Sequence, residues 1–242
     1  MTAAEARKKQ WESLRDKPLT DKLKYIFTYY WPGIVGALCV VIFLVSWIGN
    51  ILLQKDVVLG GHIINGVKVE SYAGDLCQDF MALQGFDSDK ETMSLGSNYL
   101  LSSNAPTETI MVMESLVSRM AAGEIDFIIS DLSSYTKFSA YHTDLRDVLT
   151  IAQQAQWKDR FVYVEQAEMD KLLSDDIDEF QTPEYFLSAE GLEDPLPIGI
   201  RLPDGCRLLQ AYDFSAEDVI FGIPISAQHI DTALAFLEYI TG

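Results

Sequence analysis

Polar side chains stand at the ends of two apolar runs, where a fold of alternating strands and helices would carry its chemistry. In open α/β sheets, ligands lie outside the carboxyl ends of the strands. We therefore predict a polar ledge, open to solvent, that contacts a ligand or a partner. Its residues are Asn65, Ser130, Asp131, Ser133 and Tyr135. Alternatively, Asp131 and Ser133 only cap the helix that follows, the commonest role of such residues there.

Motifs of catalysis are missing from the sequence. The three histidines are His62, His142 and His229, and neither His62 nor His229 stands beside Ser or Cys in a nucleophile motif. The chain contains no HExxH, P-loop or GxGxxG pattern. We therefore expect no enzyme activity and no cofactor, with an exported hydrolase as an alternative.

The part of the chain after residue 53 is strongly acidic. Residues 54–242 hold 32 acidic and 11 basic residues, a net charge of −21. Such a surface repels the phosphates of nucleic acids, so we expect no nucleic acid partner. One acidic cluster invites a calcium interpretation: Asp175, Asp176, Asp178 and Glu179. It lacks the Gly and the distant Glu of an EF-hand loop, so we expect a solvated linker and no metal site.

Cysteine usage leaves two alternatives open. Cys39 falls inside an apolar run, which leaves Cys77 and Cys206 in the acidic part of the chain. Outside the cytoplasm these two could form a disulfide, and in a reducing setting they would be buried thiols. Two cysteines fit none of the four-ligand zinc patterns.

An uncharged run of twenty-one residues, Gly33–Leu53, dominates the first part of the chain. As an α-helix it would be about 31 Å long, which matches a hydrocarbon core of roughly 30 Å. Trp31 and Trp47 near its two ends suit the aromatic belts of a membrane. We predict a transmembrane anchor helix over residues 31–54. A cleaved signal peptide is disfavoured, because the run is longer than a signal's apolar region.

Orientation follows from the basic residues that flank the anchor. Residues 1–24 hold seven of them: Arg7, Lys8, Lys9, Arg15, Lys17, Lys22 and Lys24. The first stretch beyond the anchor offers only Lys55. By the positive-inside rule, we predict a cytoplasmic basic tail over 1–30 and an extracytoplasmic domain over 55–242, held at the cell membrane as a single-pass protein.

Strands and helices alternate along this domain. Apolar or alternating runs predict strands at 57–65, 93–101, 125–131, 161–164, 197–202 and 219–225. Apolar residues spaced three and four apart predict helices at 71–84, 106–122 and 227–241, and a helical segment is expected at 132–141. We expect Gly123 to end the second helix and Ser226 to cap the last. Helical crossovers predict a parallel or mixed sheet covered on both faces, with 125–131 as a central parallel strand.

Two stretches resemble the extracytoplasmic solute-binding proteins of bacterial ABC importers. Met113–Leu149 (MESLVSRMAAGEIDFIISDLSSYTKFSAYHTDLRDVL) is similar to their first lobe, with an amphipathic helix that ends in Ala-Ala-Gly and a strand with Asp near its start. Ile223–Ile240 (IPISAQHIDTALAFLEYI) is similar to their closing strand and Ser-capped helix. The resemblance implies a single three-layer αβα domain like one lobe of a type 2 periplasmic binding protein.

The chain also departs from that family. Its members trap a solute by closing two lobes, and here only residues 165–195 remain for the second lobe, which is too few. A single lobe encloses too little of a small solute to bind it well. We therefore expect an accessory module that docks on an integral membrane protein such as a transporter permease. The alternatives are a solute receptor of an ABC uptake system and a purely structural assembly subunit.

Overall fold

A computed structural model describes residues 18–102, 105–172 and 183–242. The chain divides into two compact units, with the boundary between Gln54 and Lys55.

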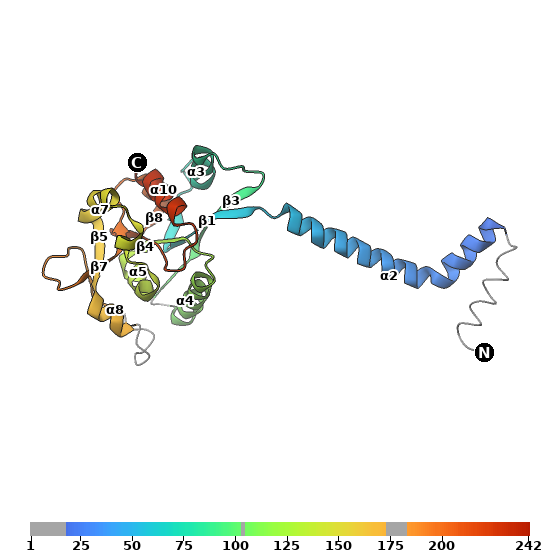
Figure 1. The fold of residues 1–242 in the computed structure, drawn as a ribbon, viewed down its shortest axis with the longest axis horizontal. Helices are drawn as coiled ribbons and strands as arrows, with labels where there is room; N and C mark the ends of the chain where they lie inside the picture. The colour runs from blue at the N-terminus through green and yellow to red at the C-terminus, as the bar shows by residue number, and fades with distance from the viewer. Residues whose placement is uncertain (1–17, 103–104, 173–182) are drawn as a thin grey trace. The chain divides into compact units, whose positions relative to one another are not determined.

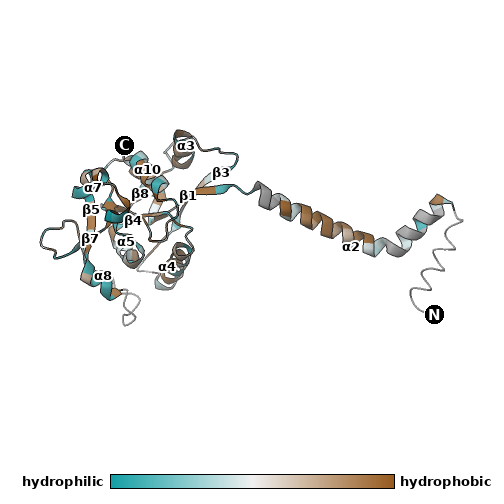
Figure 2. Ribbon diagram, viewed as in Figure 1, coloured by the Kyte–Doolittle hydropathy of each residue, from teal (hydrophilic) through white to brown (hydrophobic). Residues whose placement is uncertain are grey.

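The first unit contains α2 (Leu19–Leu53), a helix of 35 residues with Pro32 inside it. Its stretch Trp31–Gly49 is long and apolar enough to cross a membrane, and none of this stretch is buried within the structure. Figure 2 shows the apolar colour along this part of the helix. The apolar helix that we predicted at 31–54 therefore forms the second part of a longer helix. Of the predicted tail over 1–30, residues 1–17 lie outside the described residues.

The second unit is a mixed α/β domain built on a central sheet (Figure 1). Within the described residues the sheet has seven strands in the order β3-β1-β4-β9-β7-β5-β6. The strands are β1 (Asp56–Ile64), β3 (Glu91–Tyr99), β4 (Phe127–Asp131), β5 (Phe161–Glu165), β6 (Tyr185–Phe186), β7 (Pro195–Arg201) and β9 (Val219–Gly222). A separate pair joins β2 (Gly66–Lys68) to β8 (Tyr212–Phe214).

The direction of the strands changes across the sheet. β1 runs parallel to both β3 and β4, whereas β9, β7, β5 and β6 are joined by antiparallel pairs. The expectation of a mixed sheet is confirmed. For β4 the prediction of a parallel strand holds on the side of β1 and is wrong on the side of β9, to which β4 is antiparallel.

Helices cover both faces of the sheet. Neighbouring residues of β1 point to opposite faces and pack into two different cores. Ile63 of β1 belongs to a core with α3 (Leu76–Gln84) and α10 (Ile230–Thr241), where the rings of Phe80 and Phe236 lie 5.1 Å apart. Ile64 points the other way, toward Leu116 of α4 (Pro106–Ala121). The remaining helical segments are α5 (Leu132–Tyr135), η1 (Thr136–Tyr141), α6 (Leu145–Val148), α7 (Ile151–Trp157), η2 (Lys158–Arg160), α8 (Gln166–Leu172) and α9 (Arg207–Ala211).

Among the elements after β1, one helix starts later than predicted, one short strand was not predicted, and one helix agrees with the prediction. The helix expected at 71–84 begins at Leu76, because the Asp75 carboxylate accepts hydrogen bonds from the N–H groups of Cys77 and Gln78 and so caps it there. The residues just after β1, beyond the strand predicted at 57–65, form β2. By contrast, the helix expected at 106–122 is confirmed, and Gly123 ends it with a φ of 71°.

The last helix begins at Ile230 rather than at 227, and Ser226 does not cap it. The Ser226 hydroxyl instead donates to the carbonyl of Met120, at the end of α4. The acceptor at the start of α10 is the buried carboxylate of Asp126, which receives the N–H groups of Gln228 and His229 at 2.9 and 2.8 Å. A carboxylate 103 positions away along the chain therefore holds the segment that leads into α10.

Candidate functional site

Asn65 connects the ends of three strands. It follows β1 in the left-handed conformation, with a φ of 58°, which Asn adopts more readily than most residues. Its side chain accepts a hydrogen bond from Leu101 N at 2.7 Å and donates to Leu101 O at 3.3 Å, next to the end of β3. The amide nitrogen also donates to Asp131 Oδ2 at 2.8 Å and Ser134 Oγ at 2.9 Å, at the end of β4. The carboxyl ends of β1, β3 and β4 are thereby held together.

Asp131 completes this strand-end cluster, defined here as Asn65, Ser130, Asp131, Ser133 and Ser134. Its Oδ1 accepts Ser133 Oγ at 2.6 Å and Ser134 N at 3.0 Å, so it caps α5 as the alternative interpretation of the sequence stated. Burial pushes the pKa of Asp131 up, but hydrogen bonds from Ser133, Asn65 and Ser134 outweigh it and hold the pKa below its usual value. The carboxylate is an acceptor for its own neighbours.

The predicted open ledge is wrong in its exposure. Ser130, Asp131 and Tyr135 are buried, Asn65 is partly buried, and Ser133 alone of the five predicted residues is exposed. Tyr135 is a core residue: its ring stacks on His142 with centroids 4.1 Å apart, and its hydroxyl donates to Ile198 O at 2.6 Å. A partner cannot reach it without unfolding the domain. The residue that sequence reasoning missed here is Ser134, which shares the hydrogen bonds of the cluster.

Apolar side chains are exposed beside the cluster. Leu100, Ile110 and Met111 are 60%, 41% and 64% exposed, and together we call them the α4 patch. The hydroxyl of Thr109 bonds both the N–H and the carbonyl of Ser102, which joins the first turn of α4 to the segment after β3. The patch therefore lies at the same end of the sheet as the strand-end cluster. Exposed apolar side chains at one end of a sheet are available for contact with another macromolecule.

A second polar group lies around His62, which is buried within β1. Arg119 Nη1 lies 2.7 Å from His62 Nε2 and 2.7 Å from the Tyr99 hydroxyl, while its Nε pairs with Glu124 at 3.1 Å. Burial, and then the charge of Arg119, lower the pKa of His62 to about 4. The imidazole is thus neutral near pH 7 and serves as an acceptor for the guanidinium, which gives it a structural role rather than that of a general acid.

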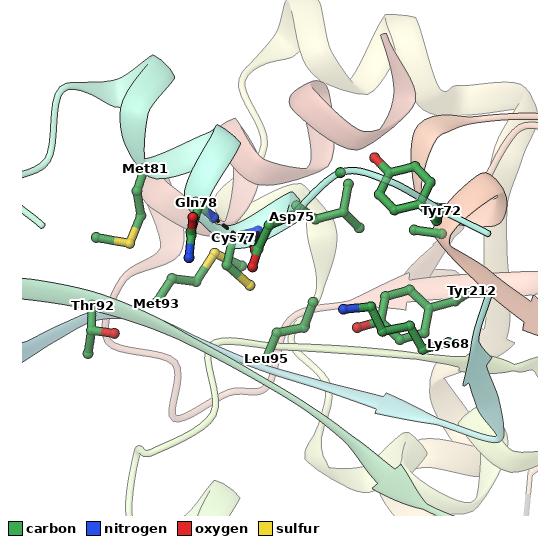
Figure 3. Close-up of a pocket in the computed structure, with 13 residues that line it drawn as sticks. Lys68, Tyr72, Asp75, Cys77, Gln78, Met81, Thr92, Met93, Leu95 and Tyr212 are labelled. Atoms are coloured by element: carbon green, nitrogen blue, oxygen red, sulfur yellow. Dashed lines mark hydrogen bonds between the residues drawn. The ribbon is translucent and has the colours of Figure 1, made fainter. Parts of the chain in front are cut away.

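A cavity of about 380 Å³ opens between α3 and β3. Figure 3 shows its lining, which comes from elements far apart in the sequence: Lys68 of β2, Asp75 and Cys77 at the start of α3, Met93 and Leu95 of β3, and Tyr212 of β8. Burial raises the pKa of the Cys77 thiol to about 11, with Asp75 raising it further and Lys68 lowering it. Sequence reasoning missed this site, although the spacing of Cys77 and Met81 on one helix face was visible.

The structure also bears on metal ligands and on the pairing of the cysteines. Among the described residues, no group of three His, Cys, Asp or Glu side chains is placed to hold a metal ion. Cys39, Cys77 and Cys206 are all free thiols in the structure. The acidic cluster for which calcium was considered, Asp175, Asp176, Asp178 and Glu179, lies outside the described residues.

Comparison with known proteins adds no family. No protein-family model matches the chain, and no curated protein matches it.

Proposed function

We propose that this chain is a single-pass membrane protein whose α/β domain docks on an integral membrane protein, with a transporter permease as the most suitable class. The observation that carries the proposal is the contrast at one end of the sheet. The polar groups of the strand-end cluster bond one another, whereas the apolar α4 patch beside them is exposed. A small solute would find few polar groups to bind there, but a protein surface could cover the patch.

The resemblance to one lobe of the type 2 periplasmic binding proteins belongs to the same proposal. The stretch Met113–Leu149, which carries the first part of the resemblance, contains the end of α4, then β4, α5 and α6. The stretch Ile223–Ile240 contains most of α10. Between β5 and β7, where a second lobe would be inserted, the described residues hold only α8 and β6. This arrangement supports a single lobe without the closing partner that traps a solute.

The apolar helix suits a partner within the same membrane. The seven basic residues before it, against Lys55 alone just after it, favour a cytoplasmic N-terminus and an extracytoplasmic domain. Confinement of both proteins to one bilayer raises their effective concentration, so a weak contact of the domain would suffice. The acidic surface, with its net charge of −21 over 54–242, disfavours nucleic acid as the partner.

Site-specific photocrosslinking in intact cells tests the docking surface. A photoactivatable amino acid in place of Met111 should trap an integral membrane protein. Leu100→Asp in the same chain should reduce that adduct about tenfold, because a carboxylate buried in an apolar contact costs affinity. Ile151, 87% exposed on α7, which packs through Trp157 into the core of the opposite face, provides the control position and should give no such adduct.

Two results would count against docking through the α4 patch. One is an adduct from Ile151 equal to that from Met111. The other is calorimetry on the purified chain that detects micromolar binding of a sugar, peptide or amino acid, which would favour the solute receptor. An adduct with a soluble exported protein in place of a membrane protein would favour the structural assembly subunit.

A further inference from the structure

Three sulfur-bearing side chains line the cavity between α3 and β3. Cys77 and Met81 are four residues apart on α3 and so share one face of the helix, and Met93 comes from β3 beneath it. Figure 3 shows the sulfur atoms of Cys77 and Met93 near each other between the helix and the strand, with that of Met81 farther along the cavity, beyond Gln78. Met81 and Met93 are 8% and 7% exposed, and Cys77 is partly buried.

The chemistry of this donor set is narrow. A thiolate and two thioethers are soft ligands, and soft sulfur ligands select Cu(I) over the hard cations Mg²⁺ and Ca²⁺. Among the described residues that line the cavity, the one carboxylate is that of Asp75. It accepts the N–H groups of Cys77 and Gln78 through Oδ1, so it is already committed to capping α3. The set therefore lacks the several oxygen ligands that a hard cation needs.

We infer that Cys77, Met81 and Met93 form a binding site for one Cu(I) ion. On binding, the Cys77 thiol releases its proton to solvent and the thiolate sulfur coordinates the metal, while the two thioethers coordinate without any change in charge. The thiolate and the monovalent cation then sum to zero charge. A neutral complex suits a place where an uncompensated charge would be costly.

A metal ion can reach the cavity from solvent. Gln78 and Asp75, which also line the cavity, are exposed and lie at its rim on the side of the thiol. The net charge of −21 over 54–242 raises the local concentration of cations near the surface. Methionine side chains have three rotatable bonds and a polarisable sulfur, so Met81 and Met93 can adjust to a metal without a shift of the backbone.

Competition for Cu(I) measures the site. The full chain, reduced and purified in detergent micelles without oxygen, is titrated into Cu(I) held by the chromophoric ligand bicinchoninate. We expect the chain to remove one Cu(I) per molecule. Cys77→Ser should weaken binding about a hundredfold, and Met81→Leu and Met93→Leu about tenfold each, since loss of a direct ligand costs at least as much as loss of an outer-shell partner.

Matched controls separate this site from other sulfur in the chain. Cys206→Ser, Cys39→Ala and Met111→Leu should leave the affinity unchanged. Met→Leu conserves volume, so the two cavity variants should keep the melting temperature of the parent, and Cys77→Ser replaces the thiol by a group of similar size. X-ray absorption of the loaded chain should show sulfur as the only kind of ligand.

Three outcomes would overturn the inference: no Cu(I) taken from the competitor, a loss of binding in Cys206→Ser or Cys39→Ala as large as in Cys77→Ser, or nitrogen and oxygen ligands in the absorption spectrum. The first would leave Met81 and Met93 as core packing only. The measurement does not depend on docking to a membrane protein, so it separates this inference from the proposed function.

Discussion

Replacing Asp126 with alanine is expected to cost the domain about 3–5 kcal/mol of unfolding free energy, because buried N–H groups would lose their acceptor. The carboxylate is 2% exposed and accepts Gly60 N at 2.7 Å in β1, in addition to the N–H groups of Gln228 and His229 at the start of α10. The ring of His229 also lies 3.1 Å from Asp126 Oδ2. One side chain therefore joins β1 and α10 to the segment before β4.

Urea denaturation of residues 55–242, followed by circular dichroism, measures this loss. Asp144→Ala is the matched control, since Asp144 caps α6 but is only partly buried, so that its partners can turn to water. We expect that variant to lose only about 1 kcal/mol. Asp126→Asn, which keeps one acceptor oxygen, should fall between the two. If Asp126→Ala were no more costly than Asp144→Ala, the role of Asp126 in joining the sheet to α10 would be wrong.

Gly222→Ala is expected to destabilise the domain by about 3 kcal/mol, at the upper end of what overpacking costs in a tight core. A Cβ at this position of β9 would lie 1.8 Å from the hydroxyl oxygen of Tyr135. That ring cannot move away easily, because it is fully buried, stacks on His142 and is hydrogen-bonded to Ile198 O. Gly85→Ala is the control: its added Cβ meets nothing within 4 Å, so only the strain of a φ of 76° remains, about 1–2 kcal/mol.

A double variant tests whether the clash involves Tyr135. Tyr135→Leu alone should destabilise the domain, since it removes a buried ring and its hydrogen bond. Combined with Gly222→Ala, the loss should be smaller than the sum of the two single losses, because the shorter side chain leaves room for the new methyl group. Additive losses, measured by the same urea denaturation, would show that the two positions are independent and that Tyr135 does not fill this space.

The elements that sequence reasoning predicted well are those with long apolar patterns. The strand that became β1, the helix α4 with its Leu116 and Met120 stripe, and the strand that became β4 each follow from a period visible in the chain. The short elements β2 and β8, of three residues each, were missed because three residues cannot display a period. They exist because the two segments pair with each other, from Gly66 with Phe214 to Lys68 with Tyr212.

Sequence reasoning predicted that the strand-end residues lie together, but not that most of them are buried. The rule for open α/β sheets located Asn65 and Asp131 correctly at strand ends that lie together. Their mutual bonding could not be foreseen, because it joins residues 66 positions apart and depends on the left-handed backbone of Asn65. The prediction that the last helix begins at 227 was wrong for a similar reason. Ser226 does not cap the helix, and the segment before α10 is held by Asp126, whose hydrogen bonds form only after the strands and the helix have packed.

The orientation of the chain in the membrane tests the central claim most directly, since docking on a membrane protein from outside the cytoplasm depends on it. A tag is placed at Met1 and a second tag after Gly242, and protease is added to intact protoplasts. The account predicts that the domain and the second tag are digested, while the tag at Met1 is protected until the membrane is broken. Protection of the domain in intact protoplasts, or recovery of the full chain in the soluble fraction, would contradict it.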